Sequence, residues 1–368
     1  MPLTSPPLTS LALVVHGGKT RAVETAERIR AWGAARGTTV VDIDVWEDDG
    51  TRRHAREELA AAGDPGLIVT VGGDGTFLRG LRLAAAGDVP VLGIDVGRVG
   101  FLTEVEAEAA IDAVEAFEAG TAHVERRLTL TVRANRPLEA PPVDANLRLR
   151  GSALPPPRIR AGDAATVGWG VPLDLTALND VVFEKLSRDR QASLAVYIDN
   201  RRFVSYSADA LIVATPTGST AYSYAAGGPV VSPRAEALVF TPVAAHMTFG
   251  RSLVLGADEP IAVQVLERSG QVLMTVDGRP RGVLDPGDWI GVYASPWRAR
   301  LVRLREPDFF GRVRSRFGIT DAAAASADGQ VPPVYHPARP VPADLAHLYM
   351  ATTPEDGGTD GGAGHPAP

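Results

Sequence analysis

The sequence predicts a protein in two parts, an N-terminal Rossmann-like α/β domain with a parallel sheet and a mostly β, sandwich-like C-terminal domain. From residue 11 to about residue 118, short apolar runs alternate with segments of helical period, which is typical of βαβ units. From residue 125 to residue 305, most of the apolar runs are instead separated by Gly, Pro and Asp turns. A glycine-rich turn ends the third apolar run, at the edge where open α/β sheets bind ligands.

The elements of the first part follow from the apolar and helical periods. We expect strands at 11–15, 39–45, 67–71 and 91–94, and helices near 20–36, 52–61, 76–86 and 107–120. In the second part, the expected strands are 128–132, 194–198, 211–214, 253–255, 261–265, 272–276 and 289–292.

The predicted organisation is an α/β domain over residues 1–124 and a β-rich domain over 125–305. Residues 306–320 are expected to return to the N-terminal domain. A Pro-, Ala- and Arg-rich insertion at 136–170 is expected to be a surface loop. The Gly- and Pro-rich tail at 321–368 is expected to be disordered, apart from a helix-like stretch near 343–350.

Composition narrows the function classes. The chain has 368 residues, a net charge of −7 and no cysteine, so disulfides, a thiolate nucleophile and cysteine-based zinc sites are excluded. It carries no long basic run, so neither a nucleic-acid partner nor a membrane surface is predicted. With no basic segment at the start and no apolar run of spanning length, we expect a cytoplasmic protein.

The glycine turn is laid out as a phosphate site. Gly72, Gly73 and Gly75 let the backbone N–H groups approach a ligand, and the helix beginning near Thr76 directs its positive dipole end the same way. Asp74 would repel phosphate there, so we expect it to accept a proton from a substrate hydroxyl or to help hold a cation. The alternative is an ordinary βα turn in which Asp74 caps the helix.

Two related motifs are absent. Gly17-Gly18-Lys19-Thr20 resembles the end of a P-loop, but Leu13 stands where that motif needs glycine. Gly93, Gly97 and Gly100 do not have the G-x-G-x-x-G spacing of the dinucleotide fingerprint. Since Lys19 and Lys185 are the only lysines, phosphate chemistry must depend on arginine, backbone N–H groups and a metal.

A second constellation follows the apolar run at 211–214. Residues 215–223 read Thr-Pro-Thr-Gly-Ser-Thr-Ala-Tyr-Ser, with hydroxyls that can meet a nucleotide and a flat face at Tyr222 for a base. The alternative is an exposed turn before an N-capped helix. Asn179 and Asp180 add a polar pair beside an apolar run, although such a pair is usually a turn.

Taken in order, these motifs resemble the NAD kinases over roughly residues 11–318. The Gly-Gly-Asp-Gly-Thr string at 72–76 also occurs in related diacylglycerol kinases, sphingosine kinases and 6-phosphofructokinases. The string at 215–222 is far more specific to NAD kinases. The match also includes residues 92–102, 178–182, 227–229 and 276–278.

The resemblance implies phosphorylation of the adenosine-ribose 2′-hydroxyl of NAD by ATP or polyphosphate, which gives NADP. It implies Asp74 as the catalytic residue and a divalent cation, Mg²⁺, held mainly by the phosphates of ATP, so no metal ligand is assigned. The implied phosphate-donor loop is Gly72, Gly73, Gly75 and Thr76. The implied NAD-binding residues are Asp74, Gly75, Arg79, Asn179, Asp180, Arg190, Asp209, Thr220, Ala221, Tyr222, Ser223, Tyr224, Ala225 and Ala244.

Some positions depart from the family pattern, and two other functions stay open. Asp180 stands where Glu is commoner, Asp95 where Asn is frequent, and Arg279 where Gln is common. A lipid kinase of the same superfamily would be expected to carry a basic or amphipathic docking face. A dinucleotide-binding regulator would keep the fold without turnover. By analogy with the family, we expect a homodimer or homotetramer.

Overall fold

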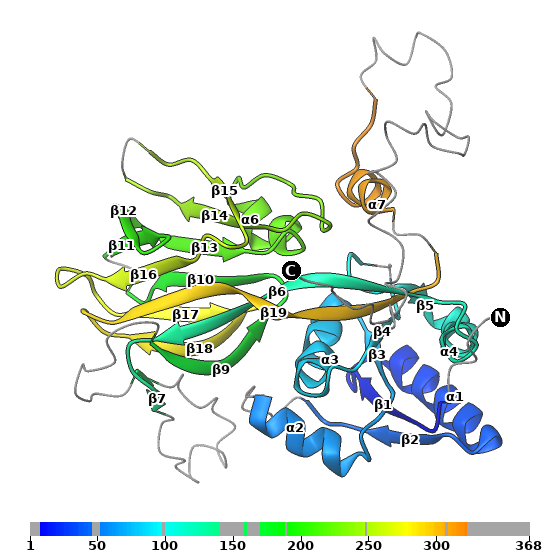
Figure 1. The fold of residues 1–368 in the computed structure, drawn as a ribbon. Helices are drawn as coiled ribbons and strands as arrows, with labels where there is room; N and C mark the ends of the chain where they lie inside the picture. The colour runs from blue at the N-terminus through cyan, green and yellow to red at the C-terminus, as the bar shows by residue number, and fades with distance from the viewer. Residues whose placement is uncertain are drawn as a thin grey trace, which may run out of the picture. The chain divides into compact units, whose positions relative to one another are not determined.

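The computed structural model describes residues 8–45, 52–97, 100–139, 158–159, 170–187, 190–246, 249–305 and 308–321. The chain divides into two compact units, residues 1–312 and 313–368. Of the second unit, the described part is the end of α7 (Phe309–Arg316) and the residues up to 321. Figure 1 shows that, in the first unit, a helix-covered parallel sheet continues into one of two stacked sheets.

The N-terminal part is built around four parallel strands in the order β4-β3-β1-β2. These strands are β1 (Ser10–Val15), β2 (Thr39–Asp42), β3 (Leu67–Gly72) and β4 (Val91–Asp95). The helices are α1 (Thr20–Arg36), α2 (Arg52–Ala61), α3 (Asp74–Gly87) and α4 (Ala110–Glu118), the last preceded by a 3-10 turn, η1 (Ala107–Ala109). Apolar clusters fill both faces of the sheet, which explains the continuous apolar runs of its strands.

One sheet continues from this part into the β-rich part. Its link is β19 (Trp289–Arg303), which pairs in parallel with β4 and antiparallel with β6 (His123–Ala134) and β16 (Ile261–Val265). Beyond β16 lie β11 (Ala192–Ile198) and β12 (Arg201–Ala208), while β9 (Val171–Ala177) pairs with β6 and β5 (Val105–Glu106) with β4. The predicted boundary at residues 124 and 125 lies near the start of β6, and the sheet crosses it.

The second sheet has the order β15-β14-β13-β10-β17-β18-β8-β7. Its strands are β7 (Leu138–Glu139), β8 (Arg158–Ile159), β10 (Asp180–Lys185), β13 (Ala210–Ala214), β14 (Ala237–Val243), β15 (Leu253–Gly256), β17 (Val272–Val276) and β18 (Arg279–Leu284).

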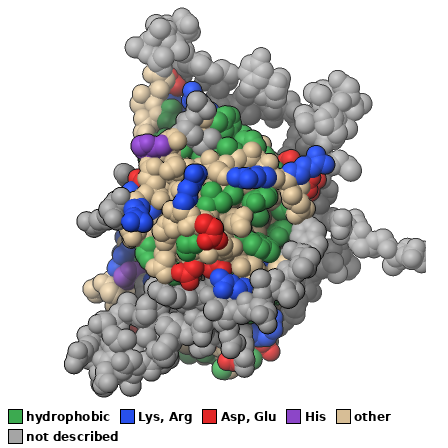
Figure 2. Space-filling model, turned by 90° about the vertical axis from the view of Figure 1, so that its left-hand side faces the viewer, with side chains coloured by type: hydrophobic (Ala, Val, Ile, Leu, Met, Phe, Trp, Pro, Cys, Tyr) green, Lys and Arg blue, Asp and Glu red, His purple; other side chains and the backbone are tan. Residues whose placement is uncertain are grey.

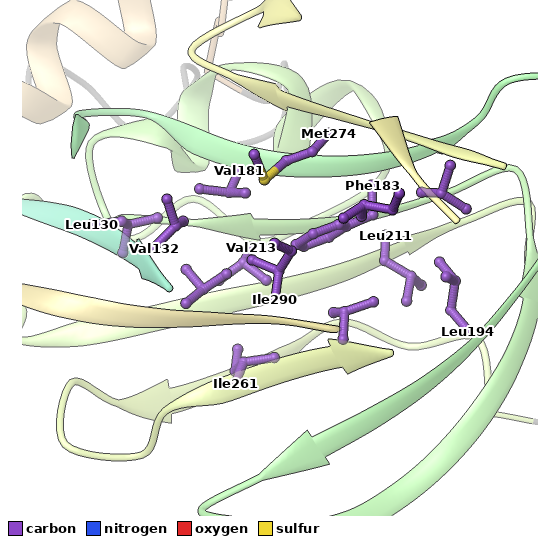
Figure 3. Close-up of a cluster of buried hydrophobic side chains, with 14 of the residues drawn as sticks. Leu130, Val132, Val181, Phe183, Leu194, Leu211, Val213, Ile261, Met274 and Ile290 are labelled. Carbon is purple, nitrogen blue, oxygen red and sulfur yellow. The ribbon is translucent and has the colours of Figure 1, made fainter. Parts of the chain in front are cut away.

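Side chains from both sheets form one core between them. Figure 3 shows Phe183 and Val213 of the second sheet beside Ile290 of the first. Alternate residues of each strand point into this core, as expected for strands that are buried on one face. The predicted fold class, a parallel α/β part with a β sandwich, is confirmed.

Several elements differ from the predicted ones. The strands β5, β9, β12 and β18 were not predicted. The apolar pattern is interrupted in β12 by two arginines at its start and in β18 by Pro280 and Gly282. The 136–170 insertion contains two short strands, β7 and β8; most of its other residues lie outside the described part, so its description as a surface loop stays a prediction. The tail beyond residue 321, with the helix expected near 343–350, also lies outside it.

Figure 2 views the molecule from the left of Figure 1, where the β-rich part ends. Acidic and basic side chains are interspersed there with apolar ones. Within the described part of the chain, no helix is long and apolar enough to cross a membrane.

Candidate active site

The glycine turn connects β3 directly to α3. Gly72 ends the strand, Gly73 is the N-cap in an extended conformation, and Asp74 is the first residue of the helix. Gly72 is required because a Cβ there would lie 2.2 Å from Oγ1 of Thr76, whose buried side chain packs against the turn. The first turn of α3 leaves backbone N–H groups without partners inside the helix, which is the usual basis of a phosphate site.

Asp74 does not cap its own helix, so the alternative of a helix-capping aspartate was wrong. Its carboxylate accepts three backbone N–H groups from the loop after β4: from Phe101 at 3.0 Å, from Leu102 at 3.1 Å and from Thr103 at 3.3 Å. Gly100 makes this approach possible, because a Cβ there would lie 2.2 Å from Asp74 Oδ1. The carboxylate is therefore held in one orientation at the end of the sheet.

The buried Asp95 organises the same loop from its other side. It accepts the N–H of Gly97 at 2.7 Å and the hydroxyl of Thr103 at 3.0 Å, and that hydroxyl accepts the N–H of Gly100 at 2.8 Å. Asp95 thus supports the loop that holds Asp74.

A cavity of about 430 Å³ opens beside the glycine turn, between the α/β part and the β-rich part. Gly73, Gly75, Thr76 and Arg79 line it, so the structure brings these predicted residues together. Four more basic side chains line it as well: Lys19, Arg82, Arg279 and Arg281. Five cationic side chains and a helix N-terminus make this cavity suited to an anion with several charges.

Sequence reasoning missed most of this basic lining. The sequence leaves lysine out of the phosphate chemistry, whereas Lys19 lines the cavity, and it marks Arg279 only as a departure from the family pattern. The scarcity of lysine pointed to arginine as the phosphate ligand, but Arg82 and Arg281 are 199 residues apart and meet only through the fold.

Asp277 connects the cavity with the second predicted constellation. It lines the cavity, and its carboxylate accepts the backbone N–H groups of Leu178, Asn179 and Asp180 at 3.0, 2.7 and 3.2 Å. Burial raises the pKa of Asp277, although the three N–H donors oppose the shift. Its backbone is left-handed, with φ +48°, because Asp277 and Gly278 form the two-residue hairpin turn between β17 and β18.

Asp180 lies at the start of β10 and is 4% exposed. Burial and the neighbouring charge of Asp277 raise the pKa of Asp180 to about 7. Asp180 can therefore change its protonation state near neutral pH.

The hydroxyl-rich loop packs on the same segment. Thr215 donates its backbone N–H to the carbonyl of Asn179 at 2.9 Å, and a Cβ at Gly218 would lie 2.0 Å from that carbonyl oxygen. The loop continues through a 3-10 turn, η2 (Gly218–Thr220), into α6 (Tyr222–Ala225). The structure thus brings the 215–225 loop against Asn179 and Asp180.

Within this loop, buried and exposed side chains have different roles. The hydroxyls of Ser223 and Thr241 bond at 2.9 Å, which attaches α6 to β14. Tyr222 and Tyr224 are 43% and 40% exposed. Burial, with smaller contributions from the charges of Glu184, Asp180 and Asp209, raises the pKa of Tyr222. Thr220, Ala221 and Ala225 lie in the same short segment.

Three predicted residues lie outside these two segments of the chain. Asp209 pairs with Lys185 at 2.6 Å, at the other end of β10 from Asp180. Ala244 follows β14 and is left-handed, with φ +48°, which alanine rarely adopts. Arg190 is exposed just before β11, and no described contact connects it with the other predicted residues.

The parallel sheet, the cationic cavity at the glycine turn and the oriented carboxylate of Asp74, which lies in sequence between the lining residues Gly73 and Gly75, define an enzyme of the phosphotransferase class. Comparison with known families agrees. Residues 11–122 match the ATP-NAD kinase N-terminal domain, and residues 178–304 match the ATP-NAD kinase C-terminal domain. The chain belongs to the ATP-NAD kinase family, so the predicted resemblance is confirmed.

Curated relatives extend this match over nearly the whole chain. NAD kinase 1 of Streptomyces avermitilis is 60% identical over 351 residues, which is 95% of this chain and 98% of the relative. NAD kinase 1 of Streptomyces coelicolor is 58% identical and covers 94% of this chain and 96% of its own length.

Solved structures share the fold at low identity. A yeast NADH kinase in complex with NADH aligns with a TM-score of 0.64 at 20% identity, over 86% of this chain and 90% of its own. An NAD kinase from Archaeoglobus fulgidus in complex with ATP aligns with a TM-score of 0.56 at 23% identity, over 83% and 98%.

Proposed function

We propose that this chain transfers the terminal phosphoryl group of ATP or polyphosphate to the adenosine-ribose 2′-hydroxyl of NAD, with Asp74 as the base. The observation that carries the proposal is the orientation of the Asp74 carboxylate by three backbone N–H groups, at the glycine turn that borders a cationic cavity. The curated relatives named NAD kinase 1 support the reaction, since they cover at least 94% of this chain.

The cavity is the proposed site of the phosphate donor. Lys19, Arg79, Arg82, Arg279 and Arg281 would neutralise its charge, and the N–H groups of Gly73 and Gly75 would approach its phosphates. Gly72 and Thr76 would shape the turn, since their close packing leaves room for no side chain at position 72.

A divalent cation fits this site only as a companion of the phosphates. Among the described residues, no group of three or more His, Asp or Glu side chains is arranged to hold a metal ion, and the carboxylates of Asp74 and Asp277 already accept backbone N–H groups. We therefore expect the phosphates to carry Mg²⁺, which would neutralise the charge that develops on them.

The acceptor is proposed to lie against the second constellation. Asn179 and Asp180 would contact the adenosine, and the 220–225 segment, with the exposed rings of Tyr222 and Tyr224, would hold the adenine side. By resemblance, Asp209 would contact the nicotinamide amide, Ala244 would offer a backbone contact and Arg190 a charge. Asp277 would fix the donor site and the acceptor site relative to each other, because it lines the cavity and its carboxylate accepts hydrogen bonds from the 178–180 backbone.

In this reaction the main task of the protein is to position the donor, the acceptor hydroxyl and the base. A carboxylate has about four lone-pair directions, and Asp74 uses three for backbone N–H groups, so one is left for the 2′-hydroxyl. As the 2′-oxygen forms its bond to the terminal phosphorus, its proton passes to Asp74 and the bond to the leaving phosphate oxygen breaks. The cationic cavity then holds the shortened donor, ADP when the donor is ATP.

A donor-by-acceptor matrix tests the proposal. ATP or polyphosphate is combined with NAD or NADH and Mg²⁺, and NADP(H) is measured. We expect NADP from NAD with at least one donor, and a loss of about 10³-fold or more in kcat for Asp74→Asn. Tight NAD binding without product for any combination of donor and acceptor would contradict the proposal and favour a dinucleotide-binding regulator. A turnover-competent Asp74→Asn would contradict the role of Asp74.

The assembly and location of the chain are part of the same proposal. By analogy with the family, we propose a cytoplasmic homodimer or homotetramer that takes small-molecule nucleotides. Light scattering of the purified full chain measures the oligomeric state, and a monomer at working concentration would contradict this part.

A further inference from the structure

A buried ionic cluster lies behind the loop that holds Asp74. Its centre is Arg303 on β19, which is 1% exposed. Arg303 donates to the carbonyl of Leu102 at 2.9 Å, to Glu104 at 3.0 Å and to Glu125 at 2.9 Å. Leu102 also donates its N–H to Asp74, so a single peptide segment joins Asp74 to Arg303.

A second contact fastens the same loop. Arg312 donates to the carbonyl of Thr103 at 2.9 Å and to Glu104 at 2.9 Å, while Glu104 accepts the N–H of Leu304 at 3.1 Å. Residues 102–104 are thus held by two arginines from the C-terminal part of the chain.

The cluster continues to the hydroxyl-rich loop. Glu125 on β6 binds Arg127 through both carboxylate oxygens, each at 2.8 Å, while it also accepts from Arg303. The other end of Arg127 donates to Oγ1 of Thr217 at 3.2 Å. Thr217 precedes η2 in the proposed acceptor loop and is 6% exposed. The contacts therefore run without interruption from Thr217 to the backbone that orients Asp74.

The energetics of such a cluster do not by themselves assign it a role in stability. Burial opposes ionisation of Glu125, but Arg127 and Arg303 outweigh it and hold the pKa of this carboxylate below its ordinary value. Buried ion pairs often stabilise a fold no better than apolar residues of the same volume would, because desolvation offsets their attraction. What they provide is a directional connection with few alternative geometries.

We propose that Arg127, Glu125 and Arg303 form a positioning relay that couples the acceptor loop, through Thr217, to the orientation of the Asp74 carboxylate. The inference rests on the function proposed above for Asp74. It assigns Arg127 and Thr217 as positioning residues, and they act through the 101–104 loop. Binding of the acceptor to the 215–225 loop would then be coupled to the orientation of the Asp74 carboxylate.

Thr217→Val tests the relay with little change of volume. It removes the hydroxyl that Arg127 contacts and leaves the Arg303 contacts to Leu102 and Glu104 in place. We expect kcat to fall about 10-fold, within the range of measured coupling between sites, with a smaller change in KM for NAD. We also expect faster hydrogen exchange at the amides of residues 101–103, although position 217 is more than 110 residues away in the sequence. Thr217→Ser keeps the hydroxyl and should behave as wild type in both measurements.

Thr129→Val is the matched control. Thr129 is a buried threonine on β6, and its hydroxyl donates to the carbonyl of Trp297 at 2.7 Å, outside the relay. It should leave exchange at 101–103 unchanged. Arg127→Lys, alone and combined with Thr217→Val, completes a double-mutant cycle, in which non-additive exchange at 101–103 supports the relay and additive effects contradict it.

The outcomes separate the relay from the proposed chemistry. A folded Thr217→Val with wild-type exchange at 101–103, or with a change only in KM for NAD, overturns the relay. If Asp74→Asn keeps full turnover, the role proposed for Asp74 fails, while the exchange data still decide whether the two loops are coupled.

Discussion

Asp180 and Asp277 bond to each other's backbone across β10 and β17. Asp180 donates its N–H to the Asp277 carboxylate at 3.2 Å, and Asp277 donates its N–H to the Asp180 carbonyl at 3.0 Å. These two hydrogen bonds bring two acidic residues together at one end of the second sheet. Asp180 has the pKa raised to about 7, and this shift has a measurable consequence for stability.

We expect Asp180 to make a contribution to the stability of the fold that falls as the pH rises from about 4 to about 7. Below its ordinary pKa of 3.8, the side chain is protonated in both states. Between 3.8 and about 7, the unfolded chain ionises first, which favours unfolding by up to about 1.4 kcal/mol per pH unit. Above about 7 both states are ionised and the effect is constant.

Asp180→Asn should remove this contribution, so its melting temperature relative to that of wild type should increase between pH 5 and pH 8. Thermal unfolding at several pH values measures the difference. Asp112→Asn, at an exposed position on α4, controls for the loss of one carboxylate. Parallel pH profiles for wild type and Asp180→Asn would contradict the shift.

Gly100→Ala should reduce turnover without abolishing substrate binding. The new Cβ would lie 2.2 Å from Asp74 Oδ1, so the carboxylate or the loop must move. Since geometry governs this reaction, we expect kcat to fall by about 10²-fold or more. Gly97→Ala is the control, because its Cβ meets nothing closer than Asp95 Oδ1 at 3.5 Å. Steady-state kinetics compare the two, and equal kcat values would show that the close approach at Gly100 is unimportant.

The parts of this site that could be predicted from the sequence are those formed by a few consecutive residues. The glycine turn, the hydroxyl-rich loop and the Asn179-Asp180 pair each occupy a few consecutive residues, and turn chemistry with family resemblance was sufficient to find them. The parallel strands were predicted as well, because strands buried on both faces form continuous apolar runs.

The supporting contacts could not be predicted, because they join residues that are distant in the sequence. Asp277 meets the 178–180 backbone only because β17 pairs with β10, and Arg303 meets Leu102 across 201 residues. No local signal marks such a partner, since an arginine on a strand such as β19 reads like any exposed charge. For Asp74, the sequence predicted the residue but not the contacts that orient its carboxylate, because the three N–H donors lie 27 to 29 residues further along the chain.

Lys19→Met should weaken use of the phosphate donor and leave the acceptor little affected. Lys19 lines the cationic cavity at the N-cap of α1, where a charge can meet a phosphate. A hydrogen bond to a charged group contributes about 1.5–3 kcal/mol, so we expect KM for the donor to rise about 10-fold or more. Arg30→Met removes a charge from the same helix, where Arg30 pairs with Asp42 away from the cavity. Initial rates at varied donor concentration measure the effect, and equal donor KM values in both variants would contradict a role for Lys19.

Gly218→Ala should impair NAD binding more than any step at the phosphate donor. A Cβ at position 218 would lie 2.0 Å from the carbonyl oxygen of Asn179, so the acceptor loop would have to separate from the segment that Asp277 holds. Overpacking of this kind typically costs about 1–3 kcal/mol, so we expect a lower melting temperature together with a rise of about 10-fold in KM for NAD. Gly250→Ala is the control, because no atom lies within 4 Å of its added Cβ. Calorimetric titration with NAD measures binding directly, and unchanged affinity in a folded Gly218→Ala would show that the loop does not form the acceptor site.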